Sequence, residues 1–250
     1  MERTALQKIV FFTLPALLIS NAAFAHDEIP TQVLEGNTVD AVITMAHACE
    51  MTPTGIPVPV IAQSVLFPAV NPVLTASNGS TTITNLSQVI EQGSLAGLID
   101  TIQNHDIFTV KAEKHDTLGN VTGFHSKTGS LAIDAQGRVP FAFTAPNFVP
   151  TSCVKKLNIE VAIADICTVS KPTISAAKVN LWIPNNGSQY ALKGITAGVD
   201  GVGDPAVLQV NRNLASNPLP SSCGAGIDLT VSPSPTDVDT NLGIPGYWSK

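Results

Sequence analysis

Histidines supply the first candidate chemistry in this sequence. The chain contains five of them: His26, His47, His105, His115 and His125. His47 stands in the run Met45-Ala46-His47-Ala48-Cys49, where strand alternation would point Met45, His47 and Cys49 to one face. A thioether beside an imidazole is a soft donor pair that suits Cu(I). The spacing predicts a copper site at His47, and the alternative is an ordinary strand end with Met45 in the core and His47 at its rim.

Three later histidines compete for the role of second ligand. His105 follows a predicted helix, where its ring could instead hydrogen-bond the terminal carbonyls. His115 and His125 flank a predicted turn, and a hairpin closed there would place Lys111 opposite His125. The two rings would then lie roughly 13 Å apart. At most one of them can therefore share an ion with His47.

The amino-terminal segment has the pattern of a removable secretory signal. A basic start precedes the apolar stretch Ile9–Ile19 and the small-residue site Ala23-Phe24-Ala25. We expect residues 1–25 to be removed, so that the mature protein begins at His26. An amino-terminal histidine offers a metal both its amine and its ring, which makes His26 a further candidate copper ligand. The apolar run is too short for a permanent membrane span, so the protein is expected in the periplasm, at the cell surface or outside the cell.

Short runs rich in Val, Ile and Thr, bounded by turn-forming residues, predict the strands that must position these side chains. We expect strands at Thr38–Met45, Val58–Phe67, Ile107–Glu113, Ser130–Ile133, Val139–Phe143, Leu157–Ile166, Val179–Ile183 and Val207–Val210. The sequence Ala135-Gln136-Gly137-Arg138 predicts a hairpin connection between the fourth and fifth of these.

One short helix is predicted from the capping residue Ser94, because Leu95, Leu98, Ile99 and Ile102 follow at helical spacing. No repeat or change of composition divides the rest of the chain. Residues 26–250 are therefore expected to form one mainly β domain, an immunoglobulin-like or related antiparallel β-sandwich with long irregular loops. The Pro-, Ser- and Asp-rich tail from about residue 232 is expected to be irregular.

The four cysteines most simply form two disulfides in an exported chain. They are Cys49, Cys153, Cys167 and Cys223. The alternating run Leu157–Ile166 predicts one unbroken strand of about 33 Å, and the residues before it could bring Cys153 back by only about 14 Å. A disulfide needs Cα atoms within about 7 Å. Pairing of Cys153 with Cys167 is therefore disfavoured, and each is expected to join Cys49 or Cys223.

The net charge and the motifs of the sequence argue against several classes of function. The net charge of −6 argues against nucleic acid as a partner. The sequence has no G-x-S-x-G elbow, phosphate-binding glycine loop or HExxH helix, so we do not expect an enzyme. Calcium is a weaker prediction, because the run Asp200-Gly201-Val202-Gly203-Asp204 and the group Asp237, Asp239 and Asn241 could supply oxygen ligands.

Several segments together resemble a known family. They are the His-x-Cys after the first long strand, Ala62-Gln63-Ser64-Val65-Leu66-Phe67-Pro68, Val179-Asn180-Leu181-Trp182-Ile183-Pro184 and Gly246-Tyr247-Trp248. In this combination the chain resembles the copper-repressible surface proteins of methane-oxidising bacteria, the CorA and MopE group. The resemblance spans most of the mature chain. It implies an exported β-rich domain that scavenges copper and binds one Cu(I) through two histidines and a kynurenine made from a tryptophan.

On this resemblance His47 matches the first histidine ligand, and the second would be one of the three later histidines. The third ligand departs from the family pattern, because Met45 precedes His47 by two residues and the only tryptophans are Trp182 and Trp248. Either the Met45 sulfur replaces the kynurenine, or a distant tryptophan folds close, or the site is lost. The plain alternative for Trp182 is a core residue on a buried strand.

The leading prediction is therefore an exported protein that binds one copper ion, as Cu(I), for copper acquisition or homeostasis. The ion would be held by His47 and one further histidine, with Met45 or His26 as a third donor. The alternative is a metal-free structural or adhesive surface domain in which the cysteines and the apolar core provide durability.

Overall fold

The computed structural model describes residues 27–46, 48–51, 56–169, 179–192 and 201–248. The predicted signal segment, residues 1–25, lies outside them. Fourteen strands in the described residues form two main sheets and one small hairpin. The prediction of a mainly β, sandwich-like fold is confirmed. None of the helices in the described residues combines the length and the apolar composition needed to cross a bilayer.

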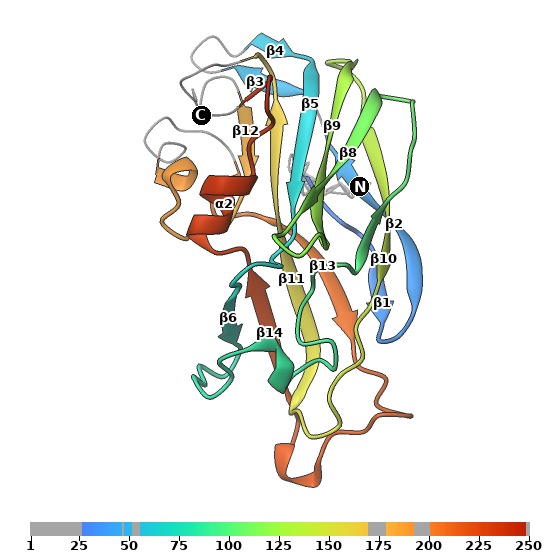
Figure 1. Cartoon of the computed structure of the whole chain (residues 1–250), viewed down its shortest axis with the longest axis vertical. Helices are drawn as coiled ribbons and strands as arrows, with labels where there is room; N and C mark the ends of the chain where they lie inside the picture. Colours follow the sequence, from blue (N-terminus) through green and yellow to red (C-terminus); the bar gives the residue numbers. More distant parts are fainter. Residues whose placement is uncertain (1–26, 47, 52–55, 170–178, 193–200, 249–250) are drawn as a thin grey trace, which may run out of the picture.

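One long strand, β11 (Val154–Ile166), runs through the centre of the larger sheet and organises it (Figure 1). Its first half lies between two strands and its second half between two others. The first pair is β13 (Ala206–Asn211) and β14 (Ile227–Ser232), and the second pair is β5 (Val60–Leu66) and β12 (Val179–Trp182). The strand therefore joins two half-sheets into one continuous layer.

Five more strands complete the two main sheets. The larger sheet continues from β5 through β9 (Val121–Leu131) to β8 (Phe108–His115), and its other half ends in β1 (Gln32–Leu34) and β6 (Val73–Ala76). The smaller sheet has the order β2 (Thr38–Met45), β10 (Gly137–Thr144) and β7 (Ile99–Thr101). It faces the β5–β9 part of the larger sheet.

The hairpin of β3 (Cys49–Met51) and β4 (Ile56–Val58) lies at one end of the sandwich, which we call the β3–β4 end (Figure 1). The described residues also contain two 3₁₀ turns, Leu86–Gln88 and Ser221–Cys223, and helix α2 (Pro235–Asn241). The predicted single strand Val58–Phe67 is thus two strands, β4 and β5, divided at Pro59. Because a proline has no N–H to give to a sheet ladder, it separates the hairpin from β5.

The core between the sheets is built on alternating inward residues. In β10, Val139, Phe141 and Phe143 are buried while their neighbours are more exposed. The Phe141 ring packs edge-on against Phe67 with 5.5 Å between centroids, and against Phe124 of β9 at 6.0 Å. These contacts fix which face of β9 points inward, and hence which of its polar side chains are enclosed.

A second apolar cluster lies on the outer face of the larger sheet, under the carboxyl-terminal segment. Trp248 is fully buried there and packs against Tyr190 with 4.7 Å between the ring centroids and 35° between the ring planes. The prediction of an irregular tail is wrong in part, because Ser234 caps α2 by accepting the N–H of Asp237. The sheet also binds the end of that helix, since Lys114 Nζ donates to the carbonyls of Asn241 and Gly243.

The predicted helix from Ser94 to Ile102 does not form. The Ser94 hydroxyl accepts the N–H of Ala96 in a turn, and Gly97 has a φ of +76°, which ends any helix at that residue. Ile99–Thr101 then pair with Phe141–Phe143 as strand β7. The hydrogen bonds that this segment makes at the edge of the smaller sheet therefore decide its conformation, although its apolar residues have helical spacing.

The predicted hairpin at Ala135–Arg138 is also wrong. Strand β9 pairs with β5 and β8, whereas β10 pairs with β2 and β7, so the connection crosses from one sheet to the other. Gly137 allows the close approach at this crossing, because a Cβ there would lie 2.5 Å from the Met45 methyl carbon. The turn itself lies at Ile133 and Asp134, while Gly137 and Arg138 already belong to β10.

The disulfide pairing agrees with the length of strand β11. Cys49 pairs with Cys167, and Cys153 pairs with Cys223. The unbroken course of β11 places Cys153 and Cys167 at opposite ends of it, as the length argument predicts. One disulfide therefore secures the β3–β4 end, and the other secures the far end of the sheet.

Candidate functional site

A row of polar side chains crosses the interior face of the larger sheet. Neighbouring strands place them in register from β8 to β12: Lys111, Ser126, Gln63, Asp165 and Asn180. All five lie on the face that carries the inward aromatic residues of the core, since alternate residues of a strand share a face. Such a row is unusual because each buried polar group must find a partner.

Two buried carboxyl groups meet in the middle of this row. Gln63 Nε2 donates to Asp165 Oδ1 and to Asp27 Oδ2, at 2.9 Å in both cases. Asp27 and Asp165 are each only 2 % exposed. Burial, reinforced by the charge of Asp165 and a hydrogen bond between the two carboxyls, raises the pKa of Asp27 well above its ordinary range. Asp27 therefore holds its proton more readily than an exposed aspartate does.

Trp182 and the disulfide of the β3–β4 end border the acid pair. The Trp182 indole N–H donates to Asp165 Oδ2 at 3.1 Å, and the ring is 4 % exposed. The Asp165 carbonyl lies 3.6 Å from the Cys167 sulfur and 3.9 Å from the Cys49 sulfur. Trp182 is thus a core residue on a buried strand, as the plain interpretation of the sequence predicted, and it is also the tryptophan that reaches this site.

The segment after His26 lies beside the segment before His47. Glu28 and Thr44 exchange both backbone hydrogen bonds, at 3.1 and 2.9 Å, in an antiparallel bridge. Asp27, which follows His26, and Met45, which stands two residues before His47, are the neighbours of these bridged residues. His26 and His47 themselves lie outside the described residues.

Met45 does not lie at the rim of this site. Its side chain is fully buried in the core, where its methyl carbon packs over Gly137. A thioether enclosed by apolar neighbours serves packing, so the structure favours the core role for Met45 over that of a copper donor.

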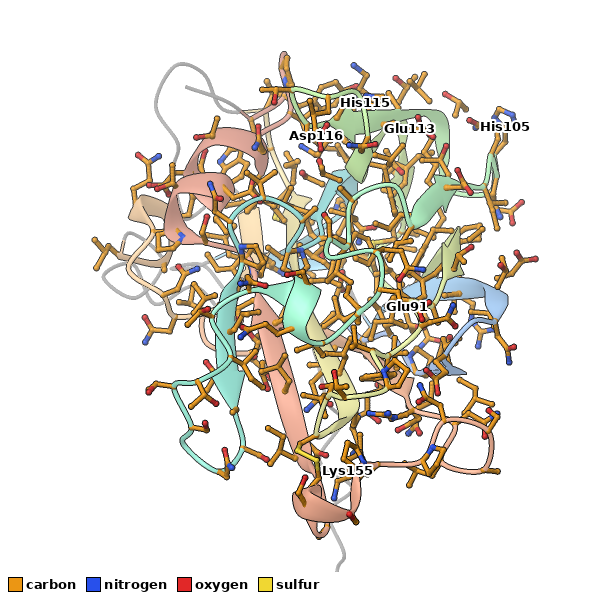
Figure 2. The ribbon with its side chains drawn as sticks, turned by 60° about the horizontal axis from the view of Figure 1, so that its bottom comes forward. Glu91, His105, Glu113, His115, Asp116 and Lys155 are labelled. Carbon is orange, nitrogen blue, oxygen red and sulfur yellow. A yellow bond between two sulfur atoms is a disulfide. The ribbon has the colours of Figure 1, made fainter. Side chains whose placement is uncertain are left out.

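The described histidines do not gather around the acid pair. His115 lies at the turn between β8 and β9, beside the end of β5 that carries Leu66. The β3–β4 end adjoins the opposite end of β5, at Val60, which is roughly 20 Å away along the strand. Its Nε2 lies 3.2 Å from Glu113 Oε2, close to the Asp116 turn. His105 is exposed in the loop after β7, not after a helix as predicted. Figure 2 shows it well apart from His115.

His125 lies on the outer face of the larger sheet. It pairs with Ala112 of β8, not with Lys111 as predicted, because a bulge between Lys114 and His115 shifts the register by one residue. Burial, followed by the charges of Lys114 and Lys127, lowers the pKa of His125 to about 4. The ring is therefore neutral at pH 7, but it faces away from the acid pair.

We predict that His125 makes the protein sensitive to acid. Its pKa in the folded protein is about 4, whereas a histidine in the unfolded chain titrates near 6.5. The unfolded chain therefore takes up a proton first as pH falls from about 6.5 to 4, and stability is lost across that range. After allowance for solvent screening of the half-exposed ring, the loss should be about 1 kcal/mol.

Urea unfolding at neutral and acidic pH measures this effect, and an NMR titration of the ring measures the pKa. His125→Gln should unfold with a weaker dependence on pH than the parent, while the exposed control His115→Gln should behave like the parent. A ring titration of His125 close to the unperturbed value would contradict the prediction.

Two of the predicted calcium ligands, Asp237 and Asp239, already accept hydrogen bonds within the protein. Asp237, Asp239 and Asn241 lie on helix α2, where Asp237 Oδ1 accepts a bond from Asn241 and Asp239 Oδ1 accepts the N–H of Gln189. Asp204 is exposed in a loop, and Asp200 lies outside the described residues.

Comparison of the chain with protein-family models, curated proteins and solved structures gives no match. Among the described residues, no group of three or more His, Cys, Asp or Glu side chains is arranged to hold a metal.

The polar row was not recognised from the sequence. Two signals for it exist, since Gln63 interrupts the apolar run of β5 and Asp165 interrupts the apolar end of β11. A polar residue within an otherwise apolar strand indicates a buried partner, but only strand register shows which partner it meets.

Proposed function

We propose that this protein is an exported copper-binding protein that holds one Cu(I) at the β3–β4 end, through His47 and His26. The bridge between Glu28 and Thr44 carries the proposal, because it holds the chain next to His26 beside the strand that leads to His47. The protein would be a carrier for copper acquisition or homeostasis and not a catalyst. The two disulfides support an oxidising location such as the periplasm or the cell surface.

The positions of the other histidines favour His26 as the partner of His47. His115 is at the far end of the hairpin, and His125 is on the outer face of the larger sheet. His105 follows β7, which β10 separates from β2, so roughly 10 Å of sheet lies between them. On the resemblance to the CorA and MopE group, Trp182 is the candidate for the oxidised tryptophan, because a hydrogen-bonded chain through Asp165 and Gln63 links it to Asp27.

We predict that His47→Ala lowers Cu(I) affinity by about 100-fold or more, because loss of a ligand costs more than loss of a supporting contact. His26→Ala should have a comparable effect. Binding in the parent should weaken below about pH 6.5, since the ligand rings must be unprotonated. Competition with a Cu(I) chelator of known affinity, and metal content of protein from its native host, measure both effects.

His105→Ala and His115→Ala are the matched controls, and they should bind copper like the parent. If His47→Ala binds copper as tightly as the parent, the assignment of the site is wrong. If the native protein contains no copper and takes up no Cu(I), the metal-free structural or adhesive surface domain becomes the better account.

A further inference from the structure

We propose that the open edge of strand β10 at Arg138 binds a short, extended, apolar peptide with free ends, which continues the line of strand β7. Peptides that bind by strand addition gain affinity from backbone hydrogen bonds and specificity from the hollows that take their side chains. The site is independent of the proposed copper function, because it uses none of the candidate copper ligands.

The backbone of Arg138 points away from its partner strand β2. Residues of an antiparallel pair alternate between those that exchange backbone hydrogen bonds and those that do not. Arg138 lies opposite Thr44, whose N–H and carbonyl are both bonded to Glu28 on the other side of β2. Thr44 and Arg138 therefore form a non-hydrogen-bonded pair. The N–H and the carbonyl of Arg138 thus face the other edge of β10, the edge along which β7 pairs.

Strand β7 stops short of this position. It pairs with Phe141–Phe143 of β10. Beyond them the Lys111 side chain separates the two strands, since its Nζ donates to the carbonyls of Ile102 and Pro140. Among the strands that the structure describes, none pairs with β10 at Arg138 on this side. An open strand edge of this kind is a template for a further strand.

A groove of about 700 Å³ lies beside the open edge. This volume is within the range of roughly 300–1,000 Å³ that is usual for sites of small ligands. Four apolar side chains contribute to its lining: Val42, Ile107, Leu131 and Pro140. The groove therefore offers apolar contacts to the side chains of an extended peptide.

A narrow pocket of about 10 Å³ adjoins the groove and shares four of its lining residues, Asn104 and Arg138 among them. Ser126 also lines this pocket and is only 2 % exposed. Within the described part of the chain its Oγ has no hydrogen-bond partner. A pocket of this size admits one small polar group or one water molecule. A carboxylate oxygen of the peptide placed there would accept the hydrogen of this buried hydroxyl.

Two opposite charges in the groove match the two ends of a peptide. Arg138 and Asp106 both line it, and neither forms an ion pair in the described residues. Asn104 Nδ2 donates to Asp106 Oδ2 at 3.0 Å, which orients that carboxylate. The Arg138 guanidinium would bind the carboxylate of the peptide, and Asp106 would bind its ammonium group. The groove is therefore complementary to a zwitterion whose charges are separated.

Binding of the tripeptide Leu-Ala-Leu to the full chain tests the proposal. Calorimetry should give a dissociation constant of about 0.1–1 mM, which corresponds to the small free energy that so few contacts supply. In NMR spectra of ¹⁵N-labelled protein, the Arg138 amide should be among the signals that shift most, because its N–H gains a hydrogen bond.

Matched variants and capped peptides identify each contact. Arg138→Gln should weaken binding of the free tripeptide about tenfold but should not affect its carboxyl-amidated form, because a charged hydrogen bond is lost only in the first case. Asp106→Asn should likewise weaken binding of the free peptide but not of its amino-acetylated form. The control variants Lys127→Gln and Asp134→Asn change charges outside the groove and should bind like the parent. Arg138→Gln should also keep Cu(I) binding, so failure of the copper proposal remains distinguishable.

A parent protein that gives neither heat nor a shift of the Arg138 amide with the tripeptide would overturn the proposal. Equal weakening by the control variants would overturn it as well, because the charges would then act only at long range. Binding of free leucine as tight as that of the tripeptide would exclude strand addition.

Discussion

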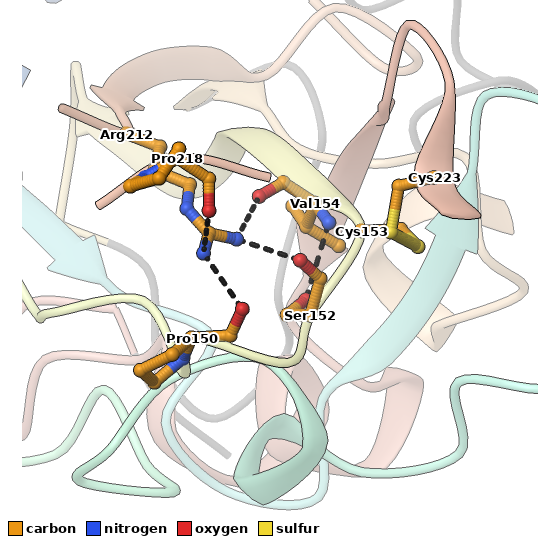
Figure 3. Close-up of a disulfide and its surroundings, with 7 residues drawn as sticks. All are labelled: Pro150, Ser152, Cys153, Val154, Arg212, Pro218 and Cys223. Carbon is orange, nitrogen blue, oxygen red and sulfur yellow. Dashed lines mark hydrogen bonds between the residues drawn. A yellow bond between two sulfur atoms is a disulfide. The ribbon is translucent and has the colours of Figure 1, made fainter. Parts of the chain in front are cut away.

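Replacing Arg212 with alanine should lower the free energy of unfolding by about 3–5 kcal/mol, because the variant leaves several buried carbonyls without a donor. The Arg212 side chain is only 4 % exposed. Its guanidinium donates to the carbonyls of Pro150, Ser152, Val154 and Pro218 (Figure 3). It also donates to the carbonyl of Asn217. One side chain thus organises the loop before β11 and the loop after β13.

Chemical denaturation of Arg212→Ala beside Arg138→Ala measures this contribution. Arg138 is exposed on β10, so its replacement should change stability by less than about 0.5 kcal/mol. Arg212→Lys should recover only part of the loss, because an ammonium cannot reproduce the planar fork of donors. Equal stability of the two alanine variants would show that the loops hold their conformation without the guanidinium.

Removal of the Cys49–Cys167 disulfide should be comparably costly. The double variant Cys49→Ala/Cys167→Ala frees a loop of 118 residues in the unfolded chain, and loop entropy alone predicts a loss of about 5 kcal/mol. Cys49 is also fully buried, so the variant leaves a small apolar void. Thermal unfolding of the oxidised parent and of the double variant measures the difference.

The two disulfides should also differ in their response to reductant. Cys153 and Cys223 are half-buried at the far end of the sheet, whereas Cys49 and Cys167 are enclosed, and thiol attack requires access to a sulfur atom. Mild reductant should therefore open Cys153–Cys223 first, and mass spectrometry after alkylation should detect the free thiols at those two positions. Simultaneous opening of both bonds in the native protein would contradict this order.

Local patterns in the sequence were sufficient to predict the strands that have the clearest patterns. Thr38–Met45 was predicted with the bounds that the structure gives, and Leu157–Ile166 was recognised as an unbroken strand. Because a strand has a fixed rise per residue, the length of β11 also excluded a bond between Cys153 and Cys167. The fold class and the exclusion of that one bond therefore rest on information that neighbouring residues carry, whereas the choice between the two remaining pairings comes from the structure.

The missed elements depended on partners that are distant in the sequence. Leu95–Ile102 has helical spacing, yet Ile99–Thr101 joins β10 because that edge offers hydrogen bonds to a strand. A single β-bulge makes Ala112, and not the predicted Lys111, the pairing partner of His125. Neither outcome is encoded in the local pattern, since both depend on which strand is available for pairing.

The sequence by itself determined a β-rich chain with two disulfides and drew attention to its histidines. Only the tertiary structure decided where buried charge would collect. Gln63 and Asp165 lie about 100 residues apart and meet because β5 and β11 pair in one register, while the bridge between Glu28 and Thr44 brings in Asp27. A side chain's type fixes what it can bind, but strand register fixes which side chains share a site, because a shift of one residue turns every side chain to the other face.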